Sequence, residues 1–201
     1  MPYTDFTLER VEAEFGLVTR PGALFADLEV VAVPAWLDDM LKRGRQAAAL
    51  VSEKARSEFL VVPILLAARD SAIGPLSIYS GQRLDVDPAR SLVGECDFIL
   101  ASTPPIPRLK APLLTVLEAK RADIELGLGQ CAAQMVAARL FNERAGGVEK
   151  PLFGCITTGE IWQFLRLEES EILLDARKLY IDQVGGILAV LQAIIKRGDP
   201  L

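Results

Sequence analysis

The stretch LLTVLEAKRAD, residues 113 to 123, decides the fold, because an apolar run ends there in a carboxylate and an ammonium. Side chains alternate between the two faces of a β-strand. In a strand over this stretch, Glu118 and Lys120 therefore share one face with alternate apolar residues before them. The pattern predicts a buried strand that delivers one acid and one amine to the same end of a sheet.

A second acid interrupts the apolar stretch GECDFIL, residues 94 to 100, where Asp97 stands inside an expected strand. An unpaired charge at such a position would be costly. If the two strands are neighbours, Asp97 and Glu118 converge, and two carboxylates with oxygen ligands alone suit Mg²⁺ or Mn²⁺. We expect Lys120 to point at the same place, where it would stabilise an anionic transition state or position the attacking water.

The composition narrows the chemistry that such a site could use. The 201 residues are 51% hydrophobic and 24% charged, which is typical of a globular chain. The net charge of −5 argues against a general nucleic-acid coat protein, but not against an enzyme that meets phosphate with a metal ion or a local basic cleft. The chain has no histidine, so catalysis would run on carboxylates, lysine, tyrosine or a hard metal.

The cysteines and the hydropathy indicate a compartment. Cys96, Cys131 and Cys155 are far apart and form no CxxC pair, which argues against zinc and favours buried free thiols in a reducing cytoplasm. The sequence shows no signal-peptide core and no run of eighteen apolar residues. We therefore expect a cytoplasmic protein that does not enter a membrane.

Downstream of residue 70, the sequence alternates between segments with strand character and segments with helix character. The expected strands cover 75–87, 91–103, 111–120, 151–159, 161–168 and 171–181. The residues 87–90 read as a hairpin turn and 104–110 as a rigid loop. The expected helices cover 124–146 and 182–198, with Asp182 as the cap of the second.

The segments upstream of residue 70 are mainly helical. We expect a helix over 5–15, a turn at 20–22, a strand or turn at 28–33 and a helix from Pro34 to near Gly44. A further helical segment over 46–70 should have a kink or a short break at Pro63.

An antiparallel hairpin combined with a crossover helix predicts an α/β fold with a mixed central β-sheet flanked by helices. We expect one domain over residues 1–201, in which an N-terminal helical extension (1–44) decorates a core (45–197).

The combination of Asp97 with Glu118-Ala119-Lys120 resembles the PD-(D/E)XK nuclease superfamily, whose fold is the restriction-endonuclease-like fold. The resemblance covers roughly residues 45–195. The stretch SEKARSEFLVVPILLAAR (52–69) is similar to the first core helix of the family, and LDVDPARSLVGECDFILA (84–101) to the hairpin that leads to the metal-binding acid. The stretch TVLEAKRADIELGLGQCAAQM (115–135) is similar to the catalytic strand and the helix after it. The chain departs from the family motif in having Cys96, not proline, before the acid.

The resemblance implies a Mg²⁺-dependent deoxyribonuclease that hydrolyses DNA phosphodiester bonds. It implies that Asp97, Glu118 and the backbone carbonyl of Ala119 hold the Mg²⁺ or Mn²⁺ ion, and that Lys120 acts on the water or the transition state. Glu58, at the position of a frequent helix-borne acid of the family, would join the site or bind a second metal.

The resemblance also implies a glutamine that faces the site, and two are available. Gln130 and Gln134 lie four residues apart, on one face of the expected helix. Arg108, Lys110 and Arg121 flank the site in sequence and could contact phosphate.

Other interpretations stay open at this point. Glu118 and Lys120 could form a plain surface ion pair, Asp97 could pair with an arginine, and the glutamines could be surface amides. The chain could be a catalytically inactive binding or assembly module of the same fold. It could also be a structural oligomerisation domain, because the apolar stripe ILAVLQAII (187–195) either covers the sheet or forms a homodimer interface.

Overall fold

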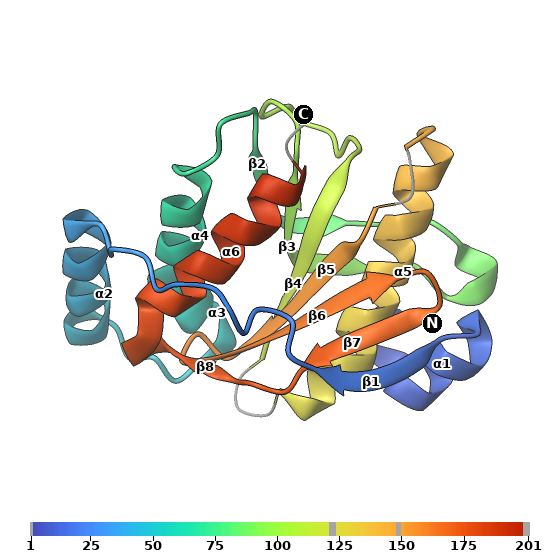
Figure 1. The fold of residues 1–201 in the computed structure, drawn as a ribbon, viewed down its shortest axis with the longest axis horizontal. Coiled ribbons are helices and arrows are strands. Elements are labelled where there is room, and N and C mark those ends of the chain that lie inside the picture. The colour runs from blue at the N-terminus through green and yellow to red at the C-terminus, as the bar shows by residue number, and fades with distance from the viewer. Residues whose placement is uncertain (1, 121–123, 148–149, 199–201) are drawn as a thin grey trace.

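The computed structural model describes residues 2–120, 124–147 and 150–198, and these form a mixed eight-stranded sheet covered by helices on both faces (Figure 1). The path through the sheet is β1-β7-β6-β5-β4-β3-β2, and β8 pairs with β6. The strands are β1 (Val18–Gly22), β2 (Ser77–Arg83), β3 (Glu95–Ala101), β4 (Leu113–Ala119), β5 (Leu152–Thr157), β6 (Ile161–Glu168), β7 (Glu171–Asp175) and β8 (Leu179–Tyr180). The expected α/β class with a mixed sheet is confirmed.

Helices form a layer on each side of the sheet. The helices α1 and α5 lie on one face, and α2, α4 and α6 on the other, where the short α3 also leads into α4 (Figure 1). Their bounds are α1 (Leu8–Phe15), α2 (Ala35–Ala47), α3 (Glu53–Arg56), α4 (Val62–Arg69), α5 (Leu128–Arg144) and α6 (Val184–Gly198).

The centre of the sheet is built from a meander and a crossover. The strands β2, β3 and β4 pair antiparallel in chain order, whereas β4 and β5 pair parallel. Parallel neighbours need a crossover connection, and α5 supplies it across one face. The carboxyl ends of β4 and β5 therefore lie side by side, close to the start of α5.

The middle of α5 is buried all round, from Gly129 to Ala138, because the sheet covers one side and the N-terminal segment covers the other. The closest approach is at Gly129, where a Cβ atom would lie 2.2 Å from the backbone oxygen of Phe6. No side chain fits in that space, so this glycine allows the N-terminal segment to pack directly on α5.

The N-terminal segment also contributes a strand, which corrects the turn expected at 20–22. The residues 20–22, predicted as a turn, lie in β1, and β1 pairs parallel with β7 at the edge of the sheet. An edge strand tolerates Pro21 because one of its sides needs no backbone donor. The residues 28–33 form neither helix nor strand. The two helices expected in this segment are confirmed as α1 and α2.

The interruption expected at Pro63 is not a break, because the helical backbone continues from Glu53 to Arg69 and the irregularity precedes the proline. A five-residue π-helical turn (Ser57–Val61) separates α3 from α4, and Pro63 stands in the first turn of α4. Near the other end of the chain, the single strand expected over 171–181 is wrong, because β7 and β8 are two separate strands that pair with different parts of β6. Asp182 lies inside a 3₁₀ turn (Ile181–Gln183) rather than at the cap of the helix.

The apolar stripe over 187–195 covers the sheet, which was one of its two expected roles. Its large aliphatic side chains are buried against α4 and the central strands: Ile187, Leu188, Leu191, Ile194 and Ile195. Among the residues that the structure describes, no helix has both the length and the apolar character needed to cross a membrane.

Candidate active site

The candidate site lies where β3 begins and β4 ends. The backbone pairing of these strands runs from Ala101 to Phe98, which lies opposite Leu117. Beyond that pair, the Oδ2 atom of Asp97 accepts a hydrogen bond from the backbone N–H of Ala119 at 2.7 Å. The Asp97 carboxylate is therefore drawn in between the two strands and fixed at the end of β4.

Glu118 is the buried centre of the site, with 3% of its surface exposed. Its Oε1 atom accepts a hydrogen bond from Nζ of Lys120 at 2.8 Å, and its Oε2 atom accepts one from Nε2 of Gln134 at 2.8 Å. Asp97 precedes Phe98 and Glu118 follows Leu117, so the register of the two antiparallel strands places the two acids across from each other, and the charge of Asp97 raises the pKa of Glu118. The two carboxyl groups thus converge, as the sequence predicted.

Lys120 follows the last residue of β4 and extends the pairing with β5 by one residue. Its backbone N–H donates to the carbonyl oxygen of Thr157 at 2.8 Å, and its Nζ atom also donates to Oε1 of Gln130 at 2.9 Å. Gly127 makes room for this side chain, since a Cβ atom there would lie 3.1 Å from Cε of Lys120. Sequence reasoning missed Gly127, although the GLG triplet at 127–129 was a signal for close packing.

The first turns of α5 supply both glutamines to the site. Gln130 holds Lys120, and Gln134 holds Glu118. Their four-residue spacing places them one above the other on the helix face that covers the end of β4. Gln134 is completely buried, and among the described residues its Oε1 atom has no hydrogen-bond partner. An unpaired buried amide oxygen costs free energy, so it is a candidate contact for a water or a ligand.

The electrostatics of the pair are set mainly by burial. Burial raises the pKa of Glu118 to about 7, and the negative charge of Asp97 adds to that effect, while Lys120 and Gln134 oppose it. Burial also raises the pKa of Asp97, against the lowering effects of the Ala119 N–H and the Lys120 charge. One ammonium faces one buried and one half-buried carboxylate, so the site has negative charge that a further cation would compensate.

The donor atoms fit a hard divalent cation with few protein ligands. Mg²⁺ usually keeps several waters and binds through one or two carboxylates together with substrate phosphates. Asp97 and Glu118 are two such carboxylates, and the unpaired oxygen of Gln134 is a third oxygen close by. Within the described ranges, no group of three or more Asp, Glu, Cys or His side chains is arranged to hold a metal. Among these residues, a metal ion would therefore not be coordinated by protein side chains alone.

The structure does not bring Glu58 to the pair. Glu58 lies in the π-helical turn before α4, its side chain is 54% exposed, and it forms an ion pair with Lys54 at 3.9 Å. The role that the resemblance implies for Glu58 stays a prediction, and in this structure its carboxylate is exposed beside Lys54.

The expected phosphate contacts are also placed differently. Lys110 and Arg108 belong to the loop before β4, at the opposite end of the strand from Glu118. A strand of this length spans roughly 20 Å, so these two residues do not flank the carboxylates. Arg121 lies outside the described residues.

No protein-family model matches the sequence, and no curated protein is significantly similar to it. The function is therefore inferred from the residues of the site and their arrangement.

Proposed function

We propose that the protein is a Mg²⁺- or Mn²⁺-dependent deoxyribonuclease of the PD-(D/E)XK type that hydrolyses phosphodiester bonds of DNA. The observation that carries the proposal is the meeting of Asp97, Glu118 and Lys120 at one end of the sheet, 2.8 Å separating the last two side chains. The supporting elements follow the order that the resemblance implies: a helix, an antiparallel hairpin, the strand that bears the motif and a helix with glutamines.

In this proposal Asp97, Glu118 and the carbonyl of Ala119 hold the ion. A bound Mg²⁺ ion supplies Lewis-acid stabilisation of phosphate charge and a lowered pKa for bound water. Lys120 places its ammonium beside the same carboxylates, where it compensates negative charge that develops on the phosphoryl oxygens. Gln130 and Gln134 keep Lys120 and Glu118 in these orientations. A reducing compartment such as the cytoplasm belongs to the same proposal, because all three cysteines are buried free thiols.

A second candidate is a catalytically inactive module of the same fold that binds a partner. The burial of Glu118 favours it, because only 3% of this residue is exposed and both carboxylate oxygens already accept hydrogen bonds from Lys120 and Gln134. A cation must displace or share these donors. The nuclease would cleave DNA and the inactive module would not, so a DNA cleavage assay distinguishes the two candidates.

The test is nicking of supercoiled plasmid and cleavage of labelled single-stranded DNA, in Mg²⁺, in Mn²⁺ and in EDTA. We expect cleavage in either metal and none in EDTA. Glu118→Gln should remove it, since the change keeps the shape but removes the charge that binds the ion. Glu58→Gln is the matched control, because it makes the same chemical change on an exposed helix outside the site.

Absence of cleavage on both substrates would contradict the nuclease proposal. Thermal unfolding with and without Mn²⁺ then examines the second candidate, because a ligand that binds only the folded state raises its apparent stability. A rise in melting temperature that disappears in Glu118→Gln would favour the inactive metal-binding module.

A further inference from the structure

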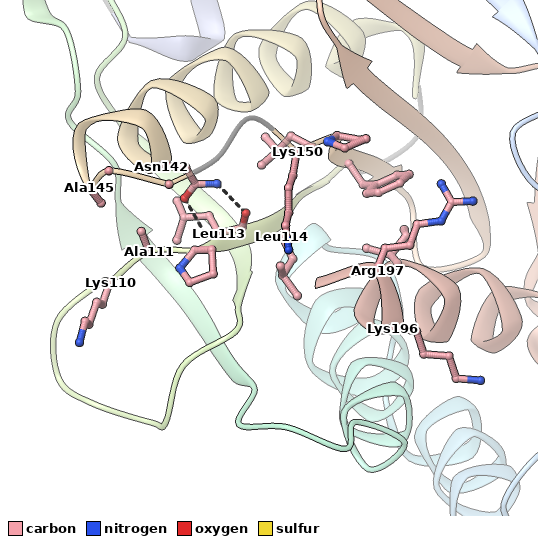
Figure 2. Close-up of a pocket in the computed structure, with 16 residues that line it drawn as sticks. Lys110, Ala111, Leu113, Leu114, Asn142, Ala145, Lys150, Lys196 and Arg197 are labelled. Carbon is pink, nitrogen blue, oxygen red and sulfur yellow. Dashed lines mark hydrogen bonds between the residues drawn. The ribbon is translucent and has the colours of Figure 1, made fainter. Parts of the chain in front are cut away.

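A cavity of about 880 Å³ lies at the end of the sheet opposite to the carboxylates (Figure 2). It opens between the starts of β4 and β5 and the last turns of α5 and α6. Its apolar surface is formed mainly by residues of the two strands and of α6: Leu113, Leu114, Leu152, Phe153 and Ile194. Small-molecule sites in proteins commonly have volumes of about 300–1,000 Å³ and a similar apolar lining.

The charged residues of the cavity are all cations. Lys110, Lys150, Lys196 and Arg197 line it, and among the described lining residues there is no aspartate or glutamate. None of the four forms an ion pair with another residue that the structure describes. Since the chain as a whole carries a net charge of −5, this concentration of positive charge runs against its composition.

Two of these cations sit over the apolar surface, and the other two mark the rim. The Lys150 side chain extends across the opening toward Leu114, while Lys110 and Lys196 point outward (Figure 2). The Arg197 guanidinium lies 5.7 Å from the centre of the Phe153 ring. Apolar surface and positive charge are thus presented to the same space.

One wall of the cavity is fixed by a pair of hydrogen bonds. Oδ1 of Asn142 accepts from the backbone N–H of Leu113 at 2.7 Å, and Nδ2 of Asn142 donates to the Leu113 carbonyl at 2.8 Å. These bonds join the last turns of α5 to the start of β4, as the dashed lines in Figure 2 show. The cavity is therefore largely preformed, which lowers the ordering cost of binding.

We propose that this cavity binds an amphipathic anion: a carboxylate or phosphate head on a single unbranched apolar tail. The tail covers the aliphatic and aromatic surface, and the head meets Lys150 and Arg197. A bare inorganic anion would leave the apolar surface in water. A DNA duplex needs a row of cations along an open face rather than a hollow with an apolar lining. The amphipathic anion alone satisfies both halves of the cavity.

The test is isothermal titration of the full-length protein with decanoate and decyl phosphate, below their micelle concentrations. We expect one site per chain, and roughly tenfold weaker binding when the tail is shortened by two methylenes. Lys150→Gln and Arg197→Gln should each weaken binding by roughly threefold to fivefold, and the double variant by about tenfold. These side chains are exposed, so the variants keep the fold. Lys42→Gln, which removes a lysine on α2, should bind as the wild type does.

Several results would overturn the proposal. Decanol binding as tightly as decanoate would remove the role of the cations, and inorganic phosphate binding as tightly as decyl phosphate would remove the role of the apolar surface. Displacement of decanoate by a short DNA duplex would assign the cavity to nucleic acid. Unchanged affinity in the double variant would place the ligand elsewhere. Glu118→Gln should leave the titration unchanged, so this site is tested independently of the nuclease proposal.

Discussion

The Asp97 carboxylate pairs with the backbone N–H of Ala119 at 2.7 Å, and so continues the contact between β3 and β4 beyond their last backbone pair. This bond explains how an acid is accommodated inside an otherwise apolar strand. It gives Asp97 two separable duties, because the oxygen atom holds the strands together whereas the negative charge serves the proposed metal site.

Asp97→Asn should separate these duties. The amide oxygen can still accept from Ala119, so we expect stability close to that of the wild type together with loss of metal-dependent cleavage. Asp97→Ala should lose cleavage and also about 1–3 kcal/mol in the free energy of unfolding, because the buried N–H is left without a partner. Urea denaturation of both variants, beside the plasmid assay, measures the difference. Equal destabilisation of the two would show that the charge, not the acceptor, holds the strands.

Glu118 should make the protein less stable as the pH rises in the absence of metal. Its pKa is raised from 4.5 to about 7 in the folded state, so the folded protein binds more protons than the unfolded chain between these values. The contribution is complete below pH 4.5 and is lost through pH 7, by about 3 kcal/mol at most. Urea denaturation in EDTA across this range should show the decline, and Glu118→Gln should flatten it. An equal slope in the variant would assign the titration to another group.

Lys120→Gln should destabilise the protein at high pH more than at low pH. The change removes the ammonium that compensates Glu118, so the ionised carboxylate becomes more costly while the protonated one is little affected. We expect a loss of about 1–3 kcal/mol at pH 8. Adding Glu118→Gln to this variant should recover most of that loss. A loss that is the same at pH 5 and pH 8 would indicate a packing effect instead.

Glu58→Gln should leave both stability and cleavage unchanged. Its carboxylate is exposed and its ion pair with Lys54 is 3.9 Å long, and such pairs contribute little. The expected change in the free energy of unfolding is within about 0.5 kcal/mol. A strong loss of cleavage in this variant would return Glu58 to the site and require α4 to move.

Gly129→Ala should test whether the N-terminal segment is integral to the fold. The added methyl group would meet the backbone of Phe6 and Thr7, which has no free rotation to move aside. We expect a loss of at least about 1–3 kcal/mol and faster proteolysis before residue 20. Gly22→Ala is the control, because its Cβ would meet only the Leu173 side chain, at 3.4 Å. Similar behaviour of the two variants would mean that the segment is only loosely attached.

Much of the fold followed from short-range patterns. The alternation ending at Glu118, the hairpin before it and the glutamine-bearing helix after it all form where periodicity places them. The convergence of Asp97 and Glu118 was predictable because neighbouring strands bring equivalent ends together. The hydrogen bond from Ala119 was not, since it depends on where the pairing of the two strands stops.

The predictions from sequence were wrong or incomplete where segments far apart in the chain determine the local structure. Pro21 and Gly22 favour a turn locally, but the free edge of β7 recruits them into a strand. The π-helical turn over Ser57–Val61 was also not predicted, and it changes which residues of that segment face inward. Gly127 was passed over because its purpose, space for Lys120, exists only once the helix is docked.

The pairing of β1 with β7 joins residues separated by roughly 150 positions, such as Val18 and Glu171. During synthesis, β1 therefore has no partner until residues 171–175 have left the ribosome. Contacts of such long range slow folding, because the loop must close before they contribute. Until then β1 stays unpaired, and nascent chains at this stage are the ones for which a chaperone is most needed.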